Sequence, residues 1–159
     1  MSDASTGVVG FAPEEIDFTV PTRNARLKWV VVVDEALPPG RAVNAAVCAA
    51  AATAPAVAGL LGDDAIDAGG GVHPGLPWAG CSVLAADADA LRRIHAKAAS
   101  SGGCLVAGMP AAAQHTRVYA DYLAAMKETA PEDVAYYAVS VVGPRNRVDK
   151  IVGRLPLLP

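Results

Sequence analysis

Hydrophobic and polar positions divide the first part of the chain into a strand, a turn and a helix. Trp29 to Val33 is an unbroken apolar run of mostly β-branched residues, which is typical of a central strand covered on both faces. The Pro38-Pro39-Gly40 stretch predicts a tight turn. The Ala/Val-rich stretch 41–54 then predicts a helix that is apolar all round and packs closely on its neighbours. Together they predict the opening unit of an α/β domain.

Strand-like and helix-like patterns of apolar residues also alternate through the rest of the chain. Apolar runs predict strands at residues 81–85, 104–109 and 134–142. Helical spacing predicts helices at residues 88–100, with Asp87 as N-cap, 116–127 and 147–155. The triple glycine at 69–71 indicates a flexible loop or a strand bulge rather than a phosphate loop. The alternation predicts an α/β three-layer sandwich with a roughly four-stranded mixed or parallel sheet covered by helices.

The first 26 residues differ from the rest. Pro13 and Pro21 interrupt any helical period, and Ile16–Val20 alternates as a short edge strand would. We therefore expect an N-terminal arm over 1–26, either poorly ordered or packed on the domain, and a single α/β domain over 27–159. The arm is acidic and lacks the basic-then-apolar pattern of a signal peptide.

Composition narrows the classes of partner. The chain is 53% hydrophobic and 18% charged, yet no apolar run reaches the roughly 18 residues of a membrane span, so no membrane partner is expected. The formal net charge of −3 disfavours a nucleic-acid partner. Its 3 cysteines form no CxxC pair, which favours free thiols in the cytoplasm. No metal-ligand spacing is present, and no cofactor is expected.

One helix face carries the first candidate site. Arg41, Asn44 and Cys48 stand at i, i+3 and i+7 and share one face of the helix. Arg41 and Asn44 would then bind an anionic small molecule at the helix start. The alternative has Arg41 reaching into solvent and Asn44 bonding a neighbouring loop. For Cys48 the preferred interpretation is a small core residue.

The remaining candidates follow strands. Asp34 ends the first strand and either meets Arg41 across the turn or is a surface carboxylate beside Glu35. His115 and Thr116 follow the third predicted strand. His115 is a candidate catalytic acid or base and Thr116 a candidate ligand-binding residue, although Thr116 also fits an N-cap. His73, expected in a loop, is a weaker candidate of the same kind.

Two segments carry a resemblance to a known family. Residues 28–33, the Gly40-Arg41 turn and the alanine-rich helix resemble the first strand and helix of type II peptidyl-tRNA hydrolases. Gly143-Pro144, Asp149-Lys150, Gly153 and Leu155 are similar to that family's closing pattern. The resemblance implies the peptidyl-tRNA hydrolase II-like fold. It is closest to the uncharacterised bacterial branch called domain of unknown function 2000.

The catalytic positions of that family do not match. Arg41 stands for its lysine, Ala45 for its glutamine and Cys48 for its histidine, and residues 109–116 lack its loop aspartate. The favoured function is therefore that of a small enzyme, such as a hydrolase, that acts on or binds an anionic small molecule. The alternative is a non-catalytic ligand-binding or interaction module, and peptidyl-tRNA hydrolysis ranks last. Four tyrosines and the low charged fraction indicate a homodimer or larger homo-oligomer.

Overall fold

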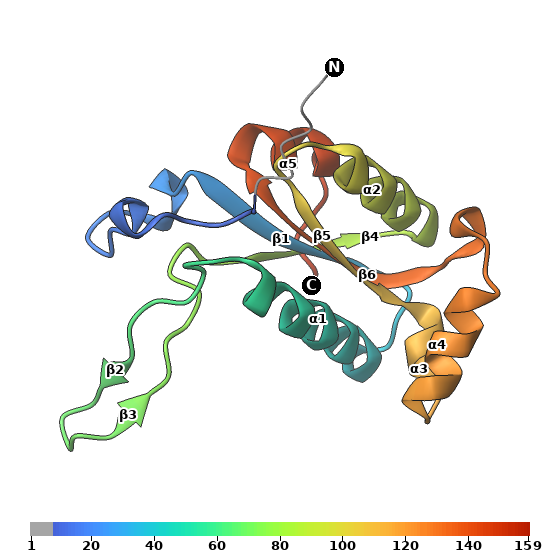
Figure 1. The fold of residues 1–159 in the computed structure, drawn as a ribbon, viewed down its shortest axis with the longest axis horizontal. Helices are drawn as coiled ribbons and strands as arrows, with labels where there is room; N and C mark the ends of the chain where they lie inside the picture. The colour runs from blue at the N-terminus through green and yellow to red at the C-terminus, as the bar shows by residue number, and fades with distance from the viewer. Residues whose placement is uncertain (1–7) are drawn as a thin grey trace.

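A four-stranded sheet with helices on both faces forms the centre of the protein (Figure 1). The structure is a computed structural model and describes residues 8–159. The strands of the sheet are β1 (Leu27–Asp34), β4 (Ser82–Ala86), β5 (Leu105–Pro110) and β6 (Tyr136–Pro144). The α-helices are α1 (Pro39–Thr53), α2 (Ala88–Ser100), α3 (Ala111–His115), α4 (Tyr119–Lys127) and α5 (Arg145–Val152). The predicted α/β class and four-stranded mixed sheet are confirmed.

The strand order is β4-β1-β6-β5. β1 pairs parallel with β4, whereas β6 runs antiparallel to both β1 and β5. The strands β1, β4 and β5 therefore point in one direction, and their carboxyl ends meet at one edge of the sheet. The open side of β4 is covered by the C-terminal tail, where Leu157 bridges to Leu84 and the Ala85 amide donates to the Pro156 carbonyl.

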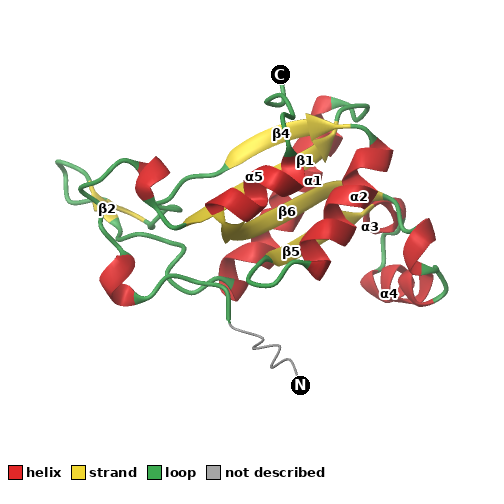
Figure 2. Ribbon diagram, turned by 90° about the horizontal axis from the view of Figure 1, so that it is seen from above, coloured by secondary structure: helices red, strands yellow, loops and turns green. Residues whose placement is uncertain are grey.

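Helices cover the two faces unequally (Figure 2). On one face, α1 buries a stripe of small side chains, Ala42, Ala45, Ala49 and Thr53, against the sheet. On the other face, α2 and α5 pack Leu91, Ile94 and Val148 over Val30 and Val139. This arrangement follows from the β-branched run of β1, whose successive side chains enter opposite layers.

A buried polar chain crosses the α1 layer. Trp29 donates its indole N–H to Ser140 Oγ at 2.8 Å, and Ser140 Oγ lies 2.7 Å from Thr53 Oγ1. The Thr53 hydroxyl donates to the Ala49 carbonyl at 2.7 Å. Since an indole only donates and a carbonyl only accepts, Ser140 must donate to Thr53. Every donor in this series of hydrogen bonds has an acceptor, and the series links β1, β6 and α1.

The segment 62–82 contains a hairpin that the sequence did not predict. β2 (Ala65–Ile66) and β3 (Val72–His73) pair antiparallel and project from the body of the molecule (Figure 1). Their turn is held by Asp67, whose Oδ1 accepts from the amides of Gly69 and Gly71. The triple glycine is therefore the tip of a hairpin, and His73 lies in a strand rather than a loop.

The N-terminal segment packs on the domain from Val9 onward. Phe11 is buried, and its amide donates to the Ala58 carbonyl at 2.8 Å. The predicted strand at residues 16–20 is wrong, because that stretch is a turn in which the Asp17 carboxylate accepts from the Thr19 amide and hydroxyl. The division into an arm over 1–26 and a domain over 27–159 stays a prediction.

The bounds of α2 are as predicted, whereas α5 begins two residues and ends three residues earlier than predicted. The helix predicted over 116–127 begins three residues later, as α4, and the short helix α3 before it was not predicted. α2 spans residues 88–100, and Asp87 caps it by accepting from the Ala90 amide at 2.8 Å. α3 ends at His115, and α4 begins only at Tyr119. The α5 helix ends at Val152 because Gly153, with φ of 62°, leaves the helical region.

Candidate functional site

The carboxyl edge of the sheet on the α1 side gathers polar side chains from distant parts of the chain. Strand β1 ends there at Asp34, α1 begins there, β5 passes there into α3, and β6 starts there at Tyr136. This is where α/β folds form ligand sites, because loops and helix starts leave the strand ends open.

Gln114 joins the two polar residues of α1. Its side-chain oxygen accepts from Arg41 Nε at 3.1 Å. Its side-chain nitrogen donates to the Arg41 carbonyl at 2.9 Å and to Asn44 Oδ1 at 3.2 Å. Arg41 and Asn44 therefore do lie on one helix face, and both contact α3.

A histidine and a tyrosine lie beside this cluster. The His115 Nε2 atom is 2.9 Å from the Tyr137 hydroxyl, and their rings meet edge to face. The Arg41 guanidinium carbon lies 5.5 Å from the centre of the Tyr137 ring, which is within the range of a cation–π contact. Tyr137 therefore touches both Arg41 and His115, and the three residues come from α1, α3 and β6.

Two of these residues, Gln114 and Tyr137, were not among the predicted site residues. Gln114 directly precedes His115 in the chain, and Tyr137 lies within the strand predicted over 134–142, but nothing local marks either as a partner of Arg41. Only the position of β5 and β6 beside α1 brings them together.

The structure does not bring Asp34 to Arg41. Asp34 is 9% exposed, and its Oδ1 accepts from the Ala36 amide at 2.9 Å, so its carboxylate closes the turn after β1. It is neither a partner of Arg41 nor a surface carboxylate. Thr116 is not an N-cap either, because its hydroxyl donates to the Ala112 carbonyl at the end of α3.

The cysteines lie outside this cluster. Cys48 is exposed, so the prediction of a small core residue is wrong. Loss of solvation raises the pKa of the Cys81 thiol to about 11, and burial also raises the pKa of Cys104. Both of these thiols are protonated at neutral pH and are poor nucleophiles. Across residues 8–159, no three His, Cys, Asp or Glu side chains gather as metal ligands would.

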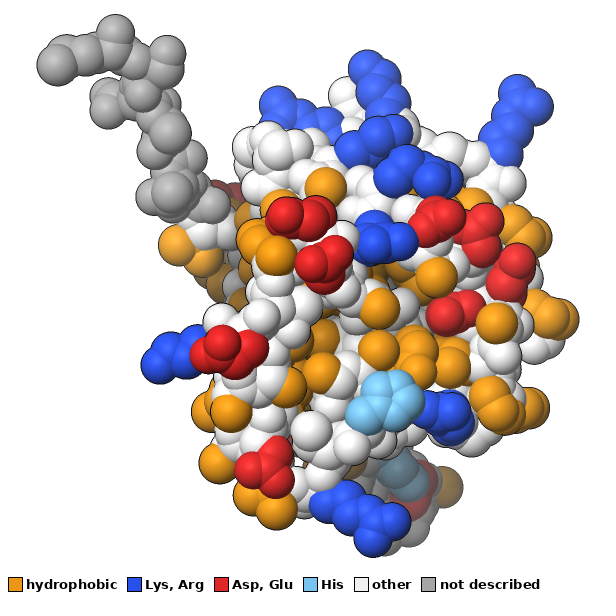
Figure 3. Space-filling view, turned by 90° about the vertical axis from the view of Figure 1, so that its right-hand side faces the viewer, with side chains coloured by type: hydrophobic (Ala, Val, Ile, Leu, Met, Phe, Trp, Pro, Cys, Tyr) orange, Lys and Arg blue, Asp and Glu red, His pale blue; other side chains and the backbone are white. Residues whose placement is uncertain are grey.

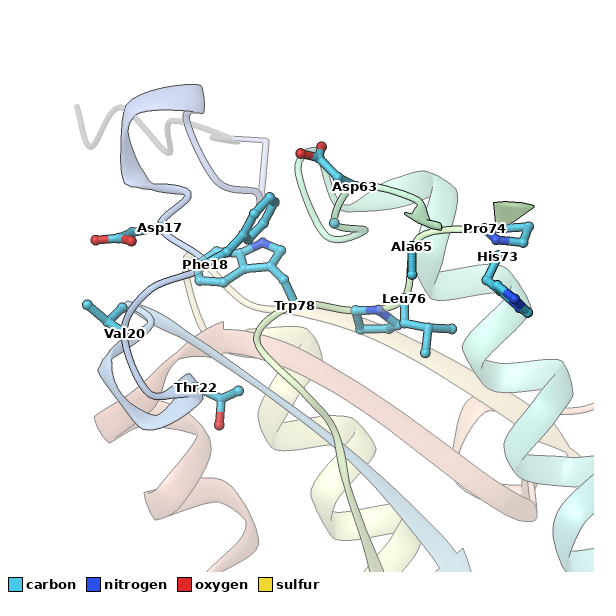
Figure 4. Close-up of a pocket in the computed structure, with 12 residues that line it drawn as sticks. Asp17, Phe18, Val20, Thr22, Asp63, Ala65, His73, Pro74, Leu76 and Trp78 are labelled. Carbon is cyan, nitrogen blue, oxygen red and sulfur yellow. The ribbon is translucent and has the colours of Figure 1, made fainter. Parts of the chain in front are cut away.

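A second, apolar groove lies at the opposite end of the molecule, between the N-terminal segment and the base of the hairpin (Figure 4). Its volume is about 390 Å³, and Phe18, Leu76 and Trp78 supply much of its wall. His73 also lines it, but its Nε2 atom pairs with Asp67 at 3.0 Å. The groove therefore offers apolar contact surface and little reactive chemistry.

Fold and site together define a small three-layer α/β protein with a cluster of polar side chains around Arg41 at the carboxyl edge of a mixed sheet. Residues 27–159 match the family described as "Protein of unknown function (DUF2000)", and the chain belongs to that family. This confirms the part of the sequence interpretation that placed the chain in domain of unknown function 2000.

A solved structure supports the fold. A protein of unknown function from Agrobacterium tumefaciens strain C58 is similar, with a TM-score of 0.74 and 20% sequence identity. The likeness covers 83% of this chain and 97% of that one. At this identity the likeness shows the fold alone. No curated protein matches the chain. Within the described part of the chain, no helix is both long and apolar enough to cross a bilayer.

Proposed function

We propose that the carboxyl edge of the sheet binds a small carboxylate or phosphate, with Arg41 as the cationic contact. The observation that carries this proposal is the way Arg41 is held. Gln114 occupies its Nε atom and Tyr137 lies under the guanidinium, whereas neither Nη group has a hydrogen-bond partner within residues 8–159. A guanidinium fixed in this way presents the two-pronged edge that binds carboxylates and phosphates.

His115 gives the site its candidate acid–base group. Its ring is oriented by the Tyr137 hydroxyl, so the second nitrogen is left for a ligand or a water molecule. A small enzyme acting on the bound anion, with His115 as the catalytic residue and Asn44 as an orienting residue, is the function we favour. We do not include Asp34 and Thr116 in this site, because their side chains form hydrogen bonds with nearby backbone groups.

A non-catalytic interaction module is the second candidate. The observation that favours it is the exposed apolar surface of Val43 and Val47 on α1 and of Ile66 and Val72 on the hairpin. An isolated two-stranded hairpin is only marginally stable in water, so its apolar side chains gain from being covered. We propose a second copy of this chain as the occupant, which gives a homodimer.

Light scattering at micromolar concentration tests the dimer. Val47→Lys combined with Ile66→Lys is expected to give monomers, whereas the control Val118→Lys, at an exposed valine outside α1 and the hairpin, leaves the mass unchanged. A monomeric mass for the unmodified protein contradicts the dimer.

The finer fold assignment, to the peptidyl-tRNA hydrolase II-like group, also stays a proposal. It is supported by the strand, turn and helix over residues 27–53 and by the closing segment from Gly143 to Leu155. Peptidyl-tRNA hydrolysis itself ranks last. Ala45 occupies the position of that family's glutamine. Its side chain is fully buried and carries no polar group, so it does not contact a substrate.

The test of the anion site is a thermal-shift screen of acetate, oxalate, citrate and phosphate. We expect at least one anion to stabilise the unmodified protein and to bind Arg41→Ala about five- to tenfold more weakly, because an exposed charge-assisted hydrogen bond contributes about 1–1.4 kcal/mol. Arg117→Ala is the matched control, since Arg117 is an exposed cation close to His115 in the chain. An equal response of both variants contradicts the proposal.

A further inference from the structure

A cavity of about 640 Å³ lies on the other face of the same sheet edge, between α2, the segment after α4 and the start of β6. Met126 and Val134 contribute apolar walls, and two arginines of α2 lie at the rim. Figure 3 views the molecule from this side; hydrophobic side chains lie among charged ones, and Lys and Arg gather toward the top, where Figure 1 places α2 and α5. The sheet separates this cavity from Arg41.

A pair of stacked rings forms a flat wall of the cavity. The rings of His95 and Tyr136 stand 4.3 Å apart and 16° from parallel. Both pack over Gly108, where an added Cβ would lie 2.6 Å from the Tyr136 ring and 3.3 Å from the His95 ring. Burial lowers the pKa of His95 and raises that of Tyr136. Both rings are therefore uncharged at neutral pH and suit a planar apolar group.

The two arginines are not equivalent. Arg92 donates to Asp89 at 2.7 Å and to the Glu132 carbonyl at 3.1 Å, so its charge is already engaged. Arg93 has neither a hydrogen bond nor a carboxylate within 4.0 Å in the described part of the chain. Glu132 also lines the cavity, so the local charge favours one negative group over a phosphate dianion.

Strand geometry explains why two sites share one edge. Tyr136 and Tyr137 are neighbours in β6, and successive side chains of a strand point to opposite faces. Tyr137 contacts His115 on the α1 side, and Tyr136 contacts His95 on the α2 side. Concave apolar walls with a few polar groups are the usual form of a small-molecule site.

We propose that this cavity is a second binding site, for a planar apolar molecule that carries a single carboxylate. The rings of His95 and Tyr136 hold the planar group, and Arg93 binds the carboxylate. The proposal is independent of the anion site at Arg41.

Calorimetric titration of the full chain with indole-3-acetate tests this site. Arg93→Gln is expected to weaken binding about five- to tenfold, because Arg93 is exposed and the lost contact is a charge-assisted hydrogen bond at the surface. Arg154→Gln is the matched control, because Arg154 is an exposed arginine that follows the end of α5 and lies outside the cavity, and it leaves binding unchanged. Arg41→Ala also leaves it unchanged, which separates this site from the proposed anion site.

Two further readouts keep the test decisive if a variant unfolds. In the unmodified protein, bound indole-3-acetate is expected to shift the ring protons of His95 in NMR spectra, because an aromatic ring stacked nearby changes their shielding. Tryptamine, which has the same ring and a positive charge, is expected to bind more weakly. Absence of binding at millimolar concentration, tighter binding of tryptamine, or equal losses in Arg93→Gln and Arg154→Gln each overturn the proposal.

Discussion

Replacing Ser140 by alanine interrupts the buried hydrogen-bond chain at its middle. In the folded protein the Trp29 indole N–H donates to Ser140, which donates to Thr53, which donates to the Ala49 carbonyl. Ser140→Ala leaves Thr53 its bond to Ala49 but leaves the Trp29 N–H without an acceptor. Ser140 is 1% and Trp29 8% exposed, so water does not readily replace the lost partner.

The expected loss of stability follows from that unsatisfied donor. A buried polar group left without its partner costs about 1–3 kcal/mol. For a chain of this size each 1 kcal/mol lowers the melting temperature by about 2–4 °C, so Ser140→Ala should lower it by about 2–12 °C. In a Trp29→Phe background the same substitution should cost less, because no indole N–H remains to be orphaned.

Urea unfolding of the four proteins in this double-mutant cycle measures the difference. Ser100→Ala serves as the control, because its hydroxyl is exposed, and we expect a change within about 0.5 kcal/mol. If Ser140→Ala costs as much in the Trp29→Phe background as in the unmodified protein, or costs nothing, the buried chain does not act as described.

Two further predictions concern helix α2 and the N-terminal segment. Asp87→Ala removes the N-cap of α2 and should lower the free energy of unfolding by about 1 kcal/mol in urea melts, with Asp87→Ser restoring most of it; an unchanged midpoint contradicts the cap. The hydrogen bond from Arg26 lowers the pKa of Glu15 from 4.5 to about 2, so Glu15 stabilises the folded state above pH 4.5, and this contribution is lost as the pH falls toward 2. Glu15→Gln should flatten the dependence of stability on pH in that window. If stability falls between pH 4.5 and 2 as steeply in the variant as in the unmodified protein, the role of this ion pair is refuted.

The elements set by local signals were predictable from the sequence. β1 follows from an unbroken run of mostly β-branched residues. α2 follows from helical spacing after an Asp cap, and its predicted bounds, 88–100, are those of the structure. The hairpin was not predictable in this way, because its strands are two residues long and its turn depends on one side chain, Asp67, accepting two amides. Such short strands give no detectable alternation.

The candidate site was predictable only where one element supplies neighbouring residues. Arg41 and Asn44 share a helix face, and helical periodicity alone places them together. Gln114 lies 70 or more residues away in the chain, and its contact depends on β5 running beside β6. Asp34 was misassigned because its carboxylate bonds an amide two residues on, a local turn that Asp often forms.

The central claim is that Arg41 and its neighbours form an anion site at the carboxyl edge of the sheet. An NMR titration tests it most directly, with phosphate or oxalate added at constant ionic strength and the side-chain N–H signals of Arg41, Gln114 and Asn44 followed. The account predicts that these signals and the His115 ring protons shift together with one saturating dissociation constant, and that Arg41→Ala raises this dissociation constant about five- to tenfold. Shifts confined to other arginines, or linear shifts without saturation, would contradict it.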